Sequence, residues 1–239
     1  NALLFTITGD AAHAETAMTI IRAYAGKLQR IDGHDAPLCA GLQGFILVNA
    51  CELLRYGYPG WTAADSKTTE AMFLRAFLPV LDEFDRRSPY ANGNWGAAVN
   101  KMRIALAVYT NDAKQYARAL DYYRHGDDNG SLPNYISATG QCQESGRDQA
   151  HVMLGLGQLA ETCEVAWNQG DDLYAELDNR LLTAYEYTSR ANLGMEVPFE
   201  RWTDKTGKYC NWHVLAEGAL GQWRAVFELP YNHYVGRRH

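Results

Sequence analysis

Apolar residues recur every three or four positions through most of the chain, which is the spacing of amphipathic helices. Ala11 to Leu28 carries one apolar stripe, whereas Leu38 to Leu54 is apolar on nearly all sides. The stretch from about Ala63 to Phe84 also has an apolar face, and Pro79 should kink or end that helix. Further helices are predicted over 95–109, 113–123, 148–167, 173–187 and about 217–229. The pattern predicts an all-α fold.

Short polar connectors separate the predicted helices. They are Thr8-Gly9-Asp10, Thr110-Asn111-Asp112 and Gln169-Gly170-Asp171-Asp172. Glycine suits the left-handed position after a helix, and Asp suits the N-cap of the next one. Such turns join antiparallel helical hairpins, which stack either as a solenoid or as a closed α/α toroid. We find no convincing β-hairpin, although Leu132 to Ile136 could form a short extended piece.

The size and composition are those of one folded domain. With 239 residues, 47% hydrophobic and 21% charged, the chain is not disordered, and we expect a single domain over residues 1–239. A net charge of −6 argues against a nucleic-acid-binding surface. The apolar stretch 36–54 contains Gln43, Asn49 and Glu52, so we interpret it as a buried helix rather than a membrane span. Residues 2–5 resemble the last turn of a helix, which suggests a fragment of a longer protein.

Motifs for metal or nucleophile chemistry are missing from the sequence. The five cysteines form no CxxC pair, so neither a thiolate zinc site nor a disulfide framework is expected. There is no HExxH and no GxSxG motif. We therefore expect no metal and no cofactor.

Three polar loops, 88–96, 140–151 and 201–212, are the candidate functional segments. If a helix begins with Ser145 as its N-cap, Arg147 and His151 share one face, and Glu144 and Asp148 lie one turn apart. The same charges could instead form an ion-paired helix start. Asn92-Gly93-Asn94 could likewise be only a turn and a cap.

Aromatic residues with a polar edge gather in or beside these loops. The chain has 15 Tyr and 6 Trp against 7 Phe. Sugar rings stack on such side chains, although they also fill gaps between helices. The loop-associated members are Trp95, Tyr135, Tyr209, Trp212, Tyr231 and Tyr234.

Four segments together resemble the alginate-lyase-like α/α-toroid proteins. They are Asn92-Gly93-Asn94-Trp95, GQCQESGRDQAH at 140–151, Ala191 to Phe199, and Tyr231-Asn232-His233-Tyr234. The likeness runs over nearly the whole chain, and its most specific part is ESGRDQ followed by His151. It is nearest to polysaccharide lyase family 38, which cleaves alginate or glucuronan. The resemblance implies an incomplete toroid that lacks N-terminal helices, and an exported, periplasmic or extracellular protein.

The chemistry that the resemblance implies is β-elimination on an acidic polysaccharide. Asn94 would neutralise the uronate carboxylate with help from Arg147, which stabilises the enolate-like intermediate. His151 would be a base or a second neutralising group. Tyr209 would be the acid or base, with Tyr234 in reserve. No metal is needed where side chains supply the positive field.

The remaining site residues have supporting roles in this prediction. Glu144 and Gln149 would orient Arg147 and His151. The substrate-binding group would contain Trp95 and Tyr135 as sugar platforms, together with His233 and Tyr234.

Two other functions remain open at this stage. A glycoside hydrolase could use Glu144 and Asp148 as acid and base, although Arg147 between them should hold both carboxylates ionised. A non-catalytic glycan-binding protein would keep the aromatic residues without needing Arg147 and His151.

Overall fold

The computed structural model describes residues 1–87, 89–209 and 211–236, and within these ranges the chain is helical with no strand. One isolated bridge joins Ile136 to Cys142. The elements are α1 (Ala2–Thr8), α2 (Ala11–Lys27), α3 (Ala36–Gly57), α4 (Ala63–Met72), η1 (Phe73–Phe77), α5 (Leu78–Arg86), α6 (Gly93–Tyr109), α7 (Ala113–His125), α8 (Leu132–Tyr135), α9 (Gln149–Asn168), α10 (Glu176–Asn192), η2 (Ala225–Phe227), α11 (Glu228–Tyr231) and η3 (Asn232–Gly236). The predicted all-α class is confirmed.

The predicted turn chemistry is confirmed at two connectors. Gly9 ends α1 with φ 73°, and the Asp10 side chain accepts the Ala12 N–H at 2.9 Å to cap α2. Asp112 caps α7 in the same way, with acceptor contacts to the N–H groups of Lys114 and Gln115. These caps satisfy helix donors that would otherwise lack partners.

Pro79 disturbs its helix as predicted. The run from α4 to α5 passes through one π-helical segment, η1, immediately before the proline. A proline ring clashes with the carbonyl four residues earlier, here Arg75, and a wider turn relieves that clash.

Two local predictions are wrong. Residues 217–224 are not helical, because Ala219 and Gly221 have left-handed φ values of 61° and 74°. Leu132 to Ile136 is not extended, because Pro133 starts the short helix α8.

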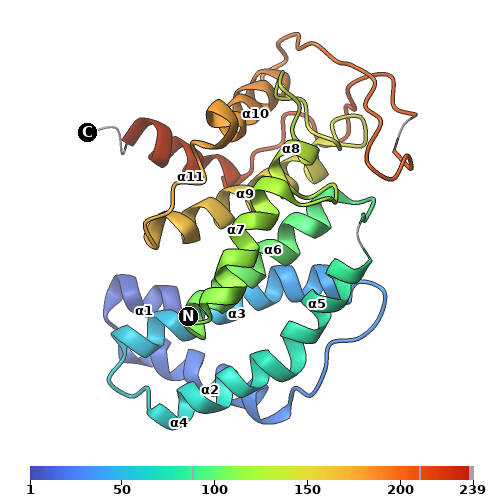
Figure 1. Cartoon of the computed structure of the whole chain (residues 1–239). Helices are drawn as coiled ribbons and strands as arrows, with labels where there is room; N and C mark the ends of the chain where they lie inside the picture. The colour runs from blue at the N-terminus through green and yellow to red at the C-terminus, as the bar shows by residue number, and fades with distance from the viewer. Residues whose placement is uncertain (88, 210, 237–239) are drawn as a thin grey trace.

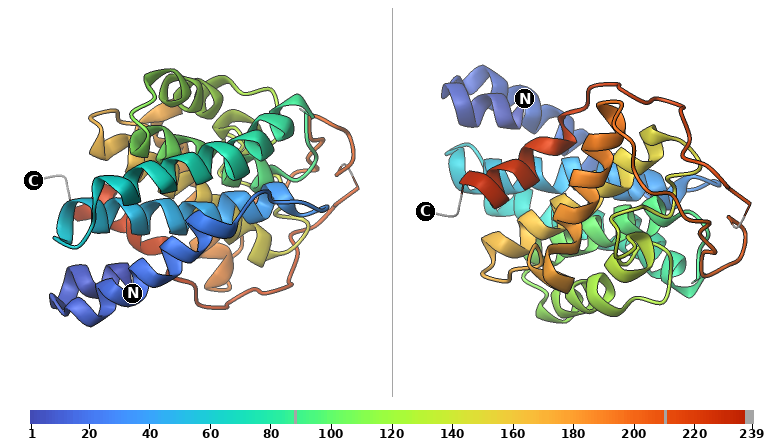
Figure 2. Two further views of the ribbon diagram at one scale, coloured as in Figure 1. Left: turned by 90° about the horizontal axis from the view of Figure 1, so that it is seen from below. Right: turned by 90° about the horizontal axis from the view of Figure 1, so that it is seen from above.

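Helix α6 lies between α3 and α9 and contacts both, while α5 and α7 pack against its outer side (Figure 1; Figure 2). All of its residues except Val108 are buried. Gly41 of α3 allows the closest approach, since a Cβ there would lie 2.7 Å from the Ala98 backbone. By length and composition α3 could cross a membrane, but its packing on α6 is that of a core helix.

The thiols do not organise this fold. Cys39, Cys51, Cys142 and Cys163 are free, and the last three are buried. Cys210 lies outside the described residues.

After α10, residues 193–224 form no helix among the residues that are described, and they run along the edge of the molecule (orange to red in Figure 1). Gln141 and Glu200 exchange two hydrogen bonds, at 2.7 and 2.8 Å. Further along, the Gln149 N–H donates to the Gly218 carbonyl at 2.8 Å. These contacts bind the 193–224 segment to the loop before α9, where the candidate residues lie.

Candidate active site

A fully buried carboxylate, Glu144, is the centre of the candidate site. Asn94, the second residue of α6, donates its amide Nδ2 to both Glu144 oxygens at 2.7 and 2.9 Å. Tyr135 of α8 donates its hydroxyl to Oε2 at 3.0 Å, and Arg147 donates Nη1 to Oε1 at 2.9 Å. Asn94, which is 50 residues away in sequence, therefore converges with the nearby Tyr135 and Arg147 on one charged group. Asn94 and Arg147 thus meet on a carboxylate of the protein itself, whereas the sequence predicts that they meet on the carboxylate of a substrate.

Tight packing makes this arrangement possible. Gly155 in α9 faces Tyr135 so closely that a Cβ would lie 2.0 Å from the tyrosine hydroxyl. The Gly93 N–H donates to the Gln143 side chain at 3.2 Å, which fastens the loop before α9 to the start of α6. The glycines of this region thus allow close approach of side chains.

Asp148 and His151 form a second pair beside the first. Asp148 is the N-cap of α9 and accepts the His151 backbone N–H at 2.8 Å. The same carboxylate contacts His151 Nδ1 at 2.6 Å. The predicted N-cap, Ser145, is wrong: α9 begins later, and the Ser145 hydroxyl accepts the Cys142 N–H instead. Arg147 therefore precedes the helix, and only a contact at 4.0 Å joins it to Asp148.

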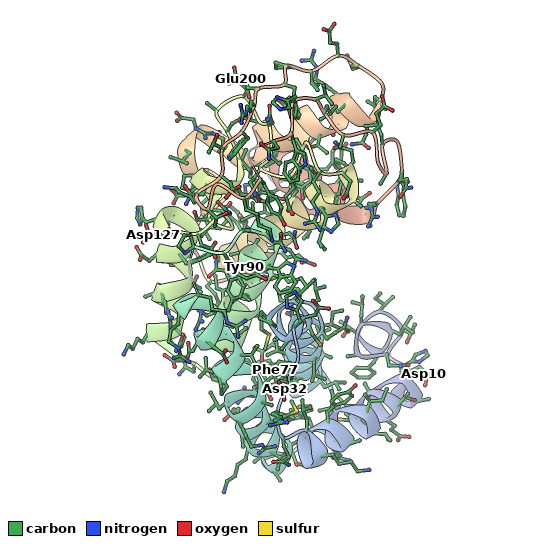
Figure 3. All side chains as sticks on the ribbon, turned by 90° about the vertical axis from the view of Figure 1, so that its right-hand side faces the viewer. Asp10, Asp32, Phe77, Tyr90, Asp127 and Glu200 are labelled. Atoms are coloured by element: carbon green, nitrogen blue, oxygen red, sulfur yellow. The ribbon has the colours of Figure 1, made fainter. Side chains whose placement is uncertain are left out.

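Tyr209 reaches the same place from the 193–224 segment. Its hydroxyl donates to Oδ1 of Asn92, directly before α6, and its ring stacks on Trp212 with centroids 4.8 Å apart. Asp204 shapes this turn by accepting the Tyr209 N–H at 2.5 Å, and Asn129 donates to Asp204 at 3.2 Å. In Figure 3, Tyr90, which precedes α6, lies between Phe77 of the N-terminal helices and Glu200 of the 193–224 segment.

Burial and charge set the protonation of these groups. Burial raises the pKa of Glu144 above its usual value, although Arg147, Tyr135 and Asn94 oppose that rise. The pKa of Asp148 is lowered: burial raises it, but the hydrogen bonds from His151 prevail. Burial raises the pKa of Tyr209, while the nearby Arg147 guanidinium lowers it. The phenol thus keeps its proton at neutral pH and lies within electrostatic reach of Arg147.

Two of the predicted roles change because of these contacts. Asn94 is fully buried and directs its amide N–H groups at Glu144, so it does not present a donor to a substrate carboxylate. Gln149 donates to the backbone carbonyl of Ala216 at 3.1 Å rather than to Arg147 or His151. Glu144 and Arg147 form an ion pair, which is the contact that the predicted orienting role of Glu144 requires.

The two predicted sugar platforms are wrong. Tyr135 is completely buried, with its hydroxyl on Glu144. Trp95 is also buried and stacks on Tyr90 at 5.3 Å, with His34 beside it at 5.7 Å. Both rings fill the core between helices, which is the alternative that the sequence left open.

His233 and Tyr234 do not join the site. The His233 ring stacks on Tyr174 with centroids 3.8 Å apart and also contacts Trp167, near the C-terminal end of α9. Tyr234 is buried and donates its hydroxyl to the Tyr174 carbonyl at 2.8 Å. The candidate site lies at the N-terminal end of α9, about 25 Å away along a helix of that length. Tyr234 is therefore excluded as the reserve acid or base.

Sequence reasoning missed Asn92, Asn129, Asp204 and the packing of Trp212 on Gly146, where a Cβ would lie 2.3 Å from the indole side chain. The Asn-Gly-Asn segment was a signal for the first of these. Nothing local marks Asn129 or Asp204, since their importance arises from contacts across 75 residues. Among the described residues, no three potential metal ligands gather in one place.

The geometry gives little support to the alternative hypothesis of a glycoside hydrolase that uses Glu144 and Asp148 as acid and base. Burial raises the pKa of Glu144, contrary to the expectation that Arg147 keeps it ionised. However, Glu144 is fully buried and both of its oxygens accept hydrogen bonds. A general acid must reach the leaving-group oxygen, and this carboxyl has no exposed surface.

One comparison with known proteins identifies a family. The alginate lyase family matches residues 1–197, which contain Asn92, Asn94, Glu144, Arg147 and His151. Tyr209 lies beyond the matched region. Neither the curated proteins nor the solved structures gave a match. Because the match spans most of the chain, the chain belongs to the alginate lyase family and is a polysaccharide lyase that acts on an acidic polysaccharide.

Proposed function

We propose that the protein cleaves a polyuronate, alginate or glucuronan, by β-elimination, with Arg147, His151 and Tyr209 as the reacting groups. The observation that carries this proposal is that buried Glu144 holds Arg147 by an ion pair, while Trp212, on which the Tyr209 ring stacks, packs against the neighbouring Gly146. A cation and a proton donor next to each other are what elimination from a uronate requires.

Arg147 is the group that neutralises the substrate carboxylate in this proposal. One guanidinium nitrogen contacts Glu144, and 29% of the side chain is exposed. The other N–H donors can bind a carboxylate as a fork. Charge withdrawn from that carboxylate stabilises the enolate-like intermediate, which makes the proton on C5 removable. Asn94 and Tyr135 contribute indirectly, because their hydrogen bonds hold Glu144 in place.

His151 is the base. With a proton on Nδ1 facing Asp148 at 2.6 Å, the ring has its lone pair on Nε2. The carboxylate of Asp148 fixes the orientation of the ring and stabilises the cation that forms when Nε2 accepts the proton. About a third of the His151 side chain is exposed, so the ring is accessible to a polymer.

Tyr209 is the acid. Its raised pKa keeps the phenol protonated at neutral pH. As the C5–H bond breaks and the C4–C5 double bond forms, the bond from C4 to the glycosidic oxygen breaks and the phenol protonates that oxygen. Asp204 and Asn129 hold the turn that carries Tyr209.

Two broader expectations belong to the same proposal. The helical hairpins would form part of an α/α toroid, and the protein would act in the periplasm or outside the cell, where such polymers occur. Both stay predictions.

The test is an assay on three polymers. The protein is incubated with alginate, glucuronan and hyaluronan, while ultraviolet absorbance measures unsaturated ends and a second assay measures reducing ends. We expect absorbance to grow on alginate or glucuronan. Reducing ends without absorbance would instead indicate hydrolysis, and no change on any polymer would contradict the proposal.

A tyrosine variant tests the assigned acid. Tyr209→Phe should lower kcat by about 10²- to 10⁴-fold, the usual contribution of general acid–base catalysis. Tyr56→Phe is the matched control, because Tyr56 is 79% exposed at the end of α3. Native turnover by Tyr209→Phe would show that another group supplies the proton.

A further inference from the structure

We propose that a polar groove beside the candidate site binds a second uronate residue of the same polymer, an inference that rests on the proposed function. The groove has a volume of about 390 Å³ and lies between α8, α10 and the 193–224 segment. That volume is within the ~300–1,000 Å³ of ordinary ligand pockets, at the size of one or two sugar rings. Its polar lining includes Ser137, Thr139, Arg180, Glu200, Arg201 and Trp202.

The charges of the groove suit an anion. Two arginines, Arg180 and Arg201, line it together with one glutamate, Glu200, so its lining is net positive in a chain of net charge −6. Arg180 donates Nη1 to the Ile136 carbonyl at 3.1 Å, which fixes this side chain at the groove wall. Arginine binds carboxylates through paired N–H donors, so a uronate carboxylate matches this lining.

The rest of the lining suits a sugar ring. The half-buried indole of Trp202 offers an apolar face for stacking. The hydroxyls of Ser137 and Thr139 lie 2.9 Å apart and can exchange hydrogen bonds with sugar hydroxyls. A site for an inorganic anion would not require the indole of Trp202, which has an apolar face.

The groove lies close to the candidate active site along two stretches of chain. Gln141 lines it, and Glu144 is three residues later, which is at most about 11 Å along an extended backbone. Trp202 lines it, and two residues later Asp204 accepts the Tyr209 N–H. A polymer with one residue at Arg147 can therefore extend a short distance into the groove.

The experiment compares substrates of increasing length. Oligouronates of defined length, from the dimer upward, are titrated into Tyr209→Phe and followed by calorimetry, and KM is measured for the active protein. We expect affinity to rise with length until the groove is filled. Arg201→Ala and Trp202→Ala should each raise KM for the polymer about tenfold and abolish that gain with length, because each removes one charge-assisted or stacking contact. Lys67→Ala is the charge-matched control, since Lys67 is exposed on α4.

The outcomes separate this inference from the proposed function. If the native protein releases unsaturated ends but both groove variants keep the native length dependence of KM, the groove inference is wrong and the proposed function stands. If no polyuronate yields unsaturated ends and none binds Tyr209→Phe, both are wrong. A length-dependent affinity that is lost in the groove variants supports the groove whether or not turnover is observed.

Discussion

Two clusters of buried charge lie along α6, and they differ in what they leave exposed. In the middle of the helix, Arg103 is 2% exposed and donates to Asp82, Asp85 and Gln115 at 3.0, 2.8 and 2.7 Å. Arg118 of α7 binds the same two aspartates. At the N-terminal end of the helix, Glu144 has equally complete hydrogen bonding, but its partner Arg147 remains partly open to solvent.

The comparison separates structural charge from functional charge. The buried Arg103 guanidinium donates its hydrogen bonds to side chains of the protein, and these bonds join α6 to α5 and α7. Around Glu144 the buried group is the anion, and the cation that it holds retains donors for a ligand. A buried carboxylate that positions an exposed guanidinium is a feature of a binding site, whereas a closed network contributes only to the fold.

The largest expected effect on stability comes from the cluster of Arg103 with Asp82, Asp85 and Gln115. Arg103→Ala should lower the free energy of unfolding by about 3 kcal/mol, because it removes a buried cation and leaves two partly buried aspartates with Arg118 as their shared partner. Urea denaturation measures this change. Arg118→Ala should cost under ~1 kcal/mol, since that side chain is 44% exposed. Equal effects of the two substitutions would contradict the structural role given to Arg103.

Arg147→Ala should affect activity rather than stability, in contrast to Arg103→Ala. We expect kcat/KM on the preferred polyuronate to fall about 10²- to 10³-fold, the usual effect of removing one group that stabilises developing charge. The fold should be retained, because Asn94 and Tyr135 still donate hydrogen bonds to Glu144 and burial already favours its protonated form. Circular dichroism and urea denaturation check the fold. An Arg147→Ala protein with native turnover would refute the site assignment.

The smallest expected effect concerns a half-exposed ion pair on the N-terminal helices. Asp65 accepts two hydrogen bonds from Arg22, at 2.7 and 2.9 Å, and these lower its pKa to about 2. An unfolded Asp titrates near ~3.9, so the stabilisation is complete above that pH and is lost as the pH falls toward 2.

Arg22→Ala should therefore reduce the loss of stability between pH 6 and pH 3 by up to about 1 kcal/mol, a discounted figure because Arg22 is 54% exposed. Urea denaturation at the two pH values measures it. The same loss of stability in the variant and the native protein would show that the pair contributes nothing measurable.

Much of the fold was predictable because its signals are local. The apolar spacing gave the helices 11–28, 95–109 and 148–167 within a few residues, and Asp10 and Asp112 cap helices as expected. Helices whose ends are marked by neighbouring residues can be identified without knowledge of the rest of the chain. The helix predicted over 217–224 is absent, because Ala219 and Gly221 adopt left-handed backbone conformations despite the apolar spacing of the segment.

The candidate site was predictable only in part. The motif around Glu144, Arg147 and His151 pointed to a loop in which Glu144 and Arg147 form an ion pair. The sequence could not show that Asn94 faces Glu144 rather than a substrate, because that contact spans 50 residues. Nor could it separate Tyr135, which is buried, from Tyr209, whose stacking partner Trp212 packs against Gly146.

The sequence by itself therefore determined the helical class, the turns and the loops that hold the chemistry, since periodicity and capping act within a few residues. Only the tertiary structure decided which polar side chains are buried as supports and which remain open to a polymer. Burial depends on packing between distant segments, as when Tyr209 meets Asn92 across 117 residues, and no local pattern encodes such a contact.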